Sequence, residues 1–353
     1  MTTKIGLDLG YANITLSNIT ADVHREPSVV LVDSATRKIL SVGNKASAFD
    51  AEGGTEGIMI RPFKNGLLYS SEITKEVINH FVGMVKPTEK IRCIIGVPCD
   101  FLAKQESEIF KMLNDAGVDE AYSVTRSVAA LIGAGYSPEM SAVSVNIGAS
   151  TTEISVIYKG KIILSQSEAV GGEEFDTAVK DFILDQGDMN VSLLVARTIK
   201  ERLGAVWQGK DSESVDIEGT LALTGSHVKM SISTEDVVGV FEKPLQKLLL
   251  AVANVVKKIP TDYVVEIFEN GIILSGGGAE IFGLDKMMTK VFEIPVTTAK
   301  NPIDCVAKGL ARINSIIPIK MRINNVNITS KLSKYYQTKT QNKKQKDGDK
   351  NEK

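Results

Sequence analysis

Three short segments of the chain place glycine beside small or polar residues directly after apolar runs, and each could bind phosphate. They read LDLGYAN at 7–13, NIGASTTE at 146–153 and SGGGAE at 275–280. Glycine permits a tight turn or a close approach, and the backbone amides that follow can converge on an anion. Each segment alone is equally typical of a plain turn. Their succession in one chain favours a shared phosphate-binding cleft.

Two side chains in these segments are candidates for the chemistry of a magnesium nucleotide. Mg²⁺ is a hard cation that prefers carboxylate oxygens or the waters they hold. We expect Asp8 to face the metal from the end of a strand. The second segment has Asn146 where a carboxylate is expected, although an amide oxygen can still accept a hydrogen bond from a metal-bound water.

Composition sets the broad class. The chain has 353 residues, of which 43% are hydrophobic and 24% are charged, and its formal net charge is −2. These values predict a globular protein with two domains and no dedicated nucleic-acid binding. The three cysteines lack metal-binding spacing, the N-terminus has no secretory pattern, and the longest apolar run, 248–256, is too short to span a bilayer. We therefore expect a cytoplasmic protein.

The elements that must position the three segments follow from periodicity. Residues 5–19 and 26–43 predict β-hairpins, and residues 142–170 repeat that plan around a tight Lys159-Gly160 turn. Helices are predicted over 70–85, with Ser71 as N-cap, and over 235–259. Two further helices are predicted over 104–117 and 127–135, and each of them ends at a glycine. Two similar αβ halves imply a nucleotide held between them.

Nine segments, in order between residues 5 and 313, together resemble MreB, the bacterial actin-like cell-shape protein family. They are IGLDLGYAN, EPSVV, RPFKNG, IIGVP, AALIGAG, NIGASTTEISVI, VGGEEFD, ENGIILSGGGAEIFGLDK and NPIDCVAKGLARI. The resemblance implies an α/β actin-like fold of the Hsp70/actin/sugar kinase superfamily, with two similar domains around a nucleotide cleft. It also implies ATP and Mg²⁺ in the cleft and assembly into cytoskeletal filaments for cell shape or motility. The abundant Lys, Asn and Ile are typical of low-GC bacteria, and divergent paralogues of the spiroplasma type are one expected source.

The resemblance also implies domain boundaries, with each domain split into two subdomains. Domain I is expected over 1–136, with 310–324 returning to it and subdomain IB at about 29–60. Domain II is expected over 137–309, with subdomain IIB at about 176–254. From 325 onward the chain loses apolar periodicity and becomes rich in lysine, which predicts a disordered tail over 325–353.

Site residues carry over position by position. The catalytic group would be Asp8, Thr125, Arg126, Asn146 and Thr151. The metal would be held by Asp8 and Asn146. The nucleotide would contact Gly10, Tyr11, Ala12, Asn13, Gly148, Ala149, Ser150, Arg197, Lys200, Glu201, Gly276, Gly277, Gly278 and Ala279.

Three departures from the family pattern concern the same site. Asn146 replaces an aspartate, Tyr11 replaces a threonine, and Thr125-Arg126-Ser127 replaces Glu-Glu-Pro. The second glutamate is the one expected to orient the attacking water, and arginine is a donor that is not deprotonated in proteins. We expect ATP binding with weak or degenerate hydrolysis. Arg126 would either attract the γ-phosphate or turn to solvent, and Thr125 or Thr151 could orient the water instead.

Other readings stay open at this stage. An Hsp70-type or sugar-kinase-type ATPase shares the superfamily, but the chain lacks a peptide-binding domain and no acceptor-site base stands out. Expected partners are further copies of the chain in homopolymeric protofilaments and paralogous MreB-like subunits, with no nucleic acid. Met84 and Val85 are thin candidates for a membrane anchor. A lysine excess in the tail could add a weak contact with anionic lipid at the inner face of the cell membrane, from Lys339, Lys343, Lys344, Lys346, Lys350 and Lys353.

Overall fold

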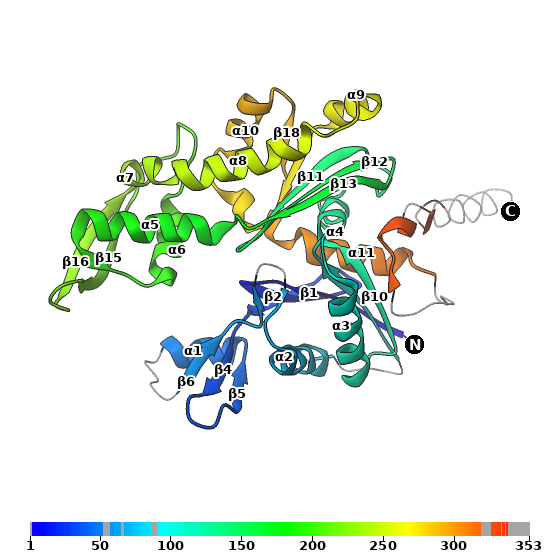
Figure 1. The fold of residues 1–353 in the computed structure, drawn as a ribbon, viewed down its shortest axis with the longest axis horizontal. Helices are drawn as coiled ribbons and strands as arrows, with labels where there is room; N and C mark the ends of the chain where they lie inside the picture. Colours follow the sequence, from blue (N-terminus) through cyan, green and yellow to red (C-terminus); the bar gives the residue numbers. More distant parts are fainter. Residues whose placement is uncertain are drawn as a thin grey trace, which may run out of the picture.

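The computed structural model describes residues 2–51, 57–64, 67–85, 90–318, 326–332, 334, 335 and 337. Two large mixed sheets form the core of the molecule, and helices α4 and α11 lie between them (Figure 1). α4 spans Arg126–Gly133 and α11 spans Cys305–Ile316. Two smaller sheets extend from this core on the same side of the molecule, at the left of the view.

The first large sheet has the strand order β19-β10-β9-β1-β2-β3. β1 pairs antiparallel with β2 and parallel with β9, so a hairpin is joined to a parallel centre. The strands are Thr2–Leu9 (β1), Asn13–Asn18 (β2), Val23–Pro27 (β3), Lys90–Val97 (β9), Glu120–Thr125 (β10) and Val326–Asn327 (β19). Helices α2 (Ser71–Gly83) and α3 (Ala103–Asp115) bury their apolar faces in the same core.

The second large sheet repeats this plan with the order β13-β12-β11-β17-β18. β11 pairs antiparallel with β12 and parallel with β17, which confirms the repeat predicted from the sequence. The strands are Ala142–Ile147 (β11), Thr152–Tyr158 (β12), Lys161–Glu168 (β13), Ile272–Ser275 (β17) and Val296–Thr298 (β18). Its core also includes α8 (Glu242–Val256), α9 (Thr261–Asn270) and α10 (Leu284–Phe292).

The smaller sheets fall inside the ranges expected for two subdomains. One has the order β5-β4-β6 and lies beside helix α1, and the other has the order β14-β15-β16 and lies beside α5, α6 and α7. The first comprises Val30–Asp33 (β4), Ile39–Val42 (β5), Asn44–Ala51 (α1) and Gly57–Ile60 (β6). The second comprises Gly172–Gly187 (α5), Met189–Asn190 (β14), Leu193–Leu203 (α6), Ser214–Leu221 (β15), His227–Ser233 (β16) and Thr234–Val238 (α7).

Short elements complete the chain. They are Phe63–Lys64 (β7), Leu67–Leu68 (β8), and the 3₁₀ turns Gly239–Phe241 (η1), Gly277–Glu280 (η2), Pro302–Asp304 (η3) and Thr329–Lys331 (η4). No helix within the described residues combines the length and the apolar character needed to cross a membrane.

The two central helices touch backbone to backbone, because glycine stands at their closest approach. A Cβ placed on Gly133 of α4 would lie 1.7 Å from the carbonyl oxygen of Cys305. A Cβ on Gly309 of α11 would lie 1.8 Å from the carbonyl oxygen of Ala129. No side chain fits in either direction, so both positions require glycine.

The elements differ from the sequence prediction at three places. The N-cap of α2 is Ser70, whose hydroxyl accepts from the Ile73 amide, and not Ser71. The helix predicted over 235–259 is divided into α7, η1 and α8, with Gly239 at the break. Part of the range predicted as a disordered tail is ordered, since β19 pairs with β10 and Ile328 and Leu332 are buried. Residues 338–353, with the lysines named above, lie outside the described residues.

Candidate functional site

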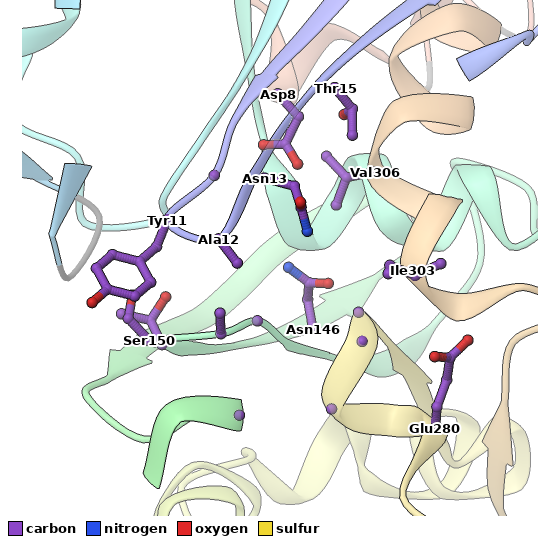
Figure 2. A pocket seen from close by; sticks show the side chains of 18 of the residues that line it. Asp8, Tyr11, Ala12, Asn13, Thr15, Asn146, Ser150, Glu280, Ile303 and Val306 are labelled. Carbon is purple, nitrogen blue, oxygen red and sulfur yellow. The ribbon is translucent and has the colours of Figure 1, made fainter. Parts of the chain in front are cut away.

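A cavity of about 240 Å³ lies between the two large sheets, where the hairpins β1–β2 and β11–β12 turn. The three glycine segments line it together with α6 and the first residue of α5, Gly172. Figure 2 shows Asn13 from the first hairpin and Asn146 from the second facing each other across this space, with Asp8 directed into it. The two halves of the molecule therefore contribute matching walls.

The first two turns are held by their own backbones. A Cβ on Gly10 would lie 2.5 Å from the carbonyl oxygen of Asn13, so the turn between β1 and β2 has no room for a side chain there. In the second turn the Gly148 amide donates to the carbonyl of Thr151, at 2.9 Å. The carbonyls of Gly148 and Ala149 accept from the first amides of α5, which fixes this turn against the helix.

The three glycines of the third segment have different roles. Gly276 has φ +80°, a region that favours glycine, and a Cβ on Gly278 would lie 2.2 Å from the Ile147 side chain. Gly277 has neither constraint, since the nearest atom to its Cβ position is 3.8 Å away on Ile303. A side chain at 277 would therefore leave the protein undisturbed and enter the cavity that Gly277 lines.

Almost all predicted site residues reach the cavity. The exceptions are Thr125 and Ala279, which do not line it. The Thr125 hydroxyl is 3.3 Å from that of Thr329 in η4, so this residue faces the packed C-terminal segment. Thr151 lines the cavity, which leaves it as the better placed of the two threonines considered for orienting a water.

Arg126 lines the cavity from the start of α4 and is tied to protein groups on both sides of it. Its Nε donates to Asp8 Oδ1 at 2.8 Å, and its Nη2 donates to the Leu9 carbonyl at 2.7 Å. Its Nη1 donates to Glu153 Oε1 at 3.3 Å. The residue is 8% exposed, so the solvent-facing alternative is wrong. Burial lowers the pKa of Arg126, but Asp8 and Glu153 outweigh it and the net shift is upward.

Glu153 is a site residue that sequence reasoning did not single out. It lies opposite Asn146 in the β11–β12 register, lines the cavity and is 2% exposed. Its Oε2 has no hydrogen-bond partner among the described residues. Burial raises the pKa of Glu153 to about 7, against the opposing attraction of Arg126. The available signal was an acidic residue within an otherwise uncharged strand, directly across the hairpin from Asn146.

The residues expected to hold Mg²⁺ fit that ion poorly. Asp8 Oδ1 accepts from Arg126, and Asn146 Oδ1 accepts from Ser275 Oγ at 3.2 Å. Figure 2 shows the Asn146 amide nitrogen turned toward Asn13, so a donor and not an acceptor faces the cavity. Mg²⁺ prefers carboxylate oxygens and near-octahedral geometry. In these contacts Asp8 and Asn146 are thus poor ligands for a bare metal ion.

Another part of the cavity wall is formed by α6, whose Lys200 Nζ donates to the Gly172 carbonyl at 3.2 Å. Arg197 Nε donates to Asp176 Oδ2 at 3.2 Å, and Lys200 Nζ lies 2.6 Å from Asp176 Oδ1. Asp176 is 1% exposed, so the two cations compensate a buried carboxylate of α5. Glu201 lines the cavity beside them. Contacts of these residues with ribose or adenine stay a prediction.

Tyr11 uses its side chain as well as its backbone. Its hydroxyl donates to Glu173 Oε1 of α5 at 2.7 Å, and so links the first hairpin to the other half of the molecule. Arg61 donates to the Tyr11 carbonyl at 3.1 Å, and its guanidinium lies 4.9 Å from the centre of the tyrosine ring. Burial, with a smaller effect of Glu173, raises the pKa of Tyr11 to about 12. An ion pair between Arg25 of β3 and Asp304 of η3 adds a further long-range contact beside the cavity.

The architecture and the cavity between the repeated halves define an actin-like protein, and comparison with solved structures supports this fold. MreB5 of Spiroplasma citri, in a structure bound to AMPPNP, superposes with a TM-score of 0.84 at 22% identity, covering 89% of this chain and 96% of that one. A MamK double helical filament gives a TM-score of 0.76 at 21% identity, covering 90% and 100%. Both alignments extend over nearly the whole fold.

The chain belongs to the MreB/Mbl protein family, whose model matches residues 2–321. The cell shape-determining protein Mbl of Bacillus cereus is 29% identical over 312 residues, which are 86% of this chain and 93% of that protein. The cell shape-determining protein MreB of Escherichia coli is 27% identical over 317 residues, covering 86% and 91%. The family resemblance predicted from the sequence is thereby confirmed, and it is favoured over the Hsp70-type and sugar-kinase-type alternatives.

Proposed function

We propose that this chain binds ATP in the cavity between its two halves and assembles into cytoskeletal filaments that serve cell shape or motility. The observation that carries the proposal is the convergence of three glycine turns, one from each hairpin and one after β17, on a single cavity. MreB5 of Spiroplasma citri has been solved with AMPPNP and with ADP, which supports a nucleotide in the corresponding place.

Substitution at Gly277 tests where the nucleotide binds. Gly277→Leu should abolish ATP binding in calorimetric titration while the circular dichroism spectrum stays unchanged, because the added side chain meets no protein atom closer than 3.8 Å at Cβ. Gly239→Leu is the matched control, since a Cβ at Gly239 also has open space but lies outside the cavity. Equal affinity in both variants would contradict this placement of the nucleotide.

Assembly is proposed from the family and from the MamK filament structure. Electron microscopy of the purified protein with ATP, with ADP and without nucleotide should show protofilaments. A protein that stays monomeric by light scattering at high concentration, with every nucleotide and with lipids, would count against assembly. Co-polymerisation with paralogous subunits and a weak contact with the inner face of the membrane are further parts of the proposal, checked by co-sedimentation with each.

Slow hydrolysis is the third part. A positioned general base or water-orienting group contributes roughly 10²- to 10⁴-fold in rate. Position 126, where the family resemblance implies such an acceptor, holds a guanidinium whose donors face Asp8, Leu9 and Glu153. Phosphate release should therefore be far slower than in a relative that has glutamate at this position.

A further inference from the structure

The cavity contains a fixed cation at its phosphate-loop end. Arg126 contacts Asp8 of β1 on one side and Glu153 of β12 on the other, so its guanidinium lies between the two hairpins that would hold phosphates. The residue is buried yet lines the cavity. A buried guanidinium with two carboxylate partners and a carbonyl partner is held in one position, with little freedom to leave.

Among the described residues, four acidic and four basic side chains line the cavity. The acidic residues that line it are Asp8, Glu153, Glu201 and Glu280. The basic residues that line it are Arg25, Arg126, Arg197 and Lys200. Three of these four cations have carboxylate partners outside the lining set, because Arg25 pairs with Asp304 and the α6 pair shares Asp176. Arg126 differs from them in pairing with carboxylates that themselves line the cavity.

A bound polyphosphate brings negative charge next to Asp8 and Glu153, and that repulsion needs compensation. Sites of this kind commonly use Mg²⁺ held by carboxylates, waters and the phosphates themselves. Here the guanidinium compensates the charge of one of the two carboxylates in advance, and burial raises the pKa of Glu153 to about 7, which lowers the negative charge of the other. Arginine has five N–H donors, of which three are directed at Asp8, Leu9 and Glu153, so two are available for a phosphate oxygen.

We infer that Arg126 supplies from the protein the positive charge that a divalent cation would otherwise bring, so that the cavity binds a nucleoside triphosphate without requiring Mg²⁺. The inference rests on the proposed ATP binding. Asn146 supports it independently, because its oxygen accepts from Ser275 and its amide nitrogen faces the cavity as a donor suited to phosphate. A metal ion at the same place would meet a fixed guanidinium and a neutral amide, which both lower its binding.

The first test compares ATP binding by the full-length chain in excess Mg²⁺ and in EDTA, by calorimetric titration. We expect the two Kd values to agree within about threefold, which is about 0.7 kcal/mol. Binding that is seen only with Mg²⁺, or is more than about tenfold tighter with it, overturns the inference but leaves the proposed function intact. No binding in either buffer overturns both.

The second test removes the charge. Arg126→Met alone would leave two carboxylates without a counter-charge and endanger folding, so it is combined with Glu153→Gln. The double variant should lose at least about tenfold in ATP affinity in EDTA, and Mg²⁺ should restore it. Arg126→Lys keeps the charge and should keep metal-independent binding. Lys75→Met removes an exposed cation that pairs with Asp115 away from the cavity, and serves as control.

Each variant is first checked for native circular dichroism and for its melting temperature in both buffers. A folded double variant that still binds ATP in EDTA as tightly as the parent chain would show that Arg126 is not the source of metal independence. If the Arg126→Lys variant needs Mg²⁺ when the parent does not, the effect belongs to the guanidinium geometry and the charge argument is overturned.

Discussion

The hydroxyl of Tyr11 donates a hydrogen bond of 2.7 Å to Glu173, and these two residues stand 162 positions apart on opposite halves of the molecule. Tyr11 lies in the turn between β1 and β2 and lines the cavity, and Glu173 lies in the first turn of α5, so the bond joins the two halves beside the cavity. Arg61 packs over the ring and holds it from the side of the small β4–β6 sheet. The Tyr11 side chain thus links the two halves of the molecule beside the cavity.

Loss of the hydrogen bond between Tyr11 and Glu173 should accelerate nucleotide release. Tyr11→Phe keeps the ring and its contact with Arg61 but loses a hydrogen bond to a carboxylate, which is worth about 1 kcal/mol or more. We expect the dissociation rate of a fluorescent ATP analogue to rise by about fivefold in stopped-flow measurements. Tyr69→Phe, at a residue that is 66% exposed, is the control. Identical rates for Tyr11→Phe and the control would argue that the bond does not limit opening.

Carboxylates placed at positions 126 and 146 should increase the rate of ATP hydrolysis. Arg126→Glu with Asn146→Asp replaces the donors at the phosphate-loop end with acceptors that can orient water. We expect phosphate release under polymerising conditions, with Mg²⁺ present, to rise by about tenfold or more, at about 1.4 kcal/mol of barrier for each tenfold. The variant should also melt at a lower temperature in EDTA, because Asp8 and Glu153 lose their buried counter-charge. If the unmodified chain already releases phosphate as fast, Thr151 or another group orients the water.

Glu153 should contribute a specific pH dependence of stability. Its folded-state pKa of about 7 lies above the ordinary value of 4.5, so between these pH values the folded state holds a proton that the unfolded state has lost. The free energy of unfolding should then fall as pH rises through this window, by up to about 1.4 kcal/mol per pH unit for one proton. The Glu153→Gln variant has no titratable group at this position and should lack this pH dependence.

Chemical denaturation at a series of pH values, for the parent chain and for Glu153→Gln, measures the effect as a difference between the two proteins. The variant should gain stability relative to the parent as pH rises from about 5 to about 7. Parallel pH profiles would mean that Arg126 keeps Glu153 ionised in the folded state. Tyr11 cannot cause a change in this range, because its pKa is raised to about 12.

A side chain added at the glycine contact between α4 and α11 should destabilise the protein. Gly133→Ala places a methyl group 1.7 Å from the Cys305 carbonyl oxygen, which forces the helices apart and should cost about 3 kcal/mol or more in unfolding free energy. Gly83→Ala is the matched control at the end of α2, where a Cβ meets nothing within 4 Å, and it should stabilise the chain by up to about 1 kcal/mol. Equal stability of the two variants would contradict the close packing.

Local sequence patterns predicted much of the fold because they depend on neighbouring residues. The Lys159-Gly160 turn has positive φ at both positions, as a two-residue hairpin loop requires. Gly117 and Gly135 follow α3 and α4 with positive φ, as predicted for their C-terminal ends. The repeated hairpins were predictable for the same reason.

The partners of the site side chains could not be predicted in this way. Arg126 meets Asp8 across 118 positions and Glu153 across 27, and residue types alone left two orientations for it, neither of which describes its contacts fully. The role of Tyr11 depends on Glu173, which lies in another domain. The order within the range predicted as tail depends on two apolar side chains, Ile328 and Leu332, that are buried where β19 pairs with β10.

The glycine crossing of α4 and α11 has a mechanical consequence for the cavity. α4 begins with Arg126 at the phosphate-loop end and finishes with Gly133 at the crossing, a rigid rod of eight residues and about 12 Å. Around this backbone contact, side chains of both helices, among them Leu131 and Leu310, share one hydrophobic core, so the two helices form a single packed unit. We expect a phosphate bound at Arg126 to act on this pair of helices as a whole, so that the occupancy of the cavity would be felt by both halves of the molecule at once.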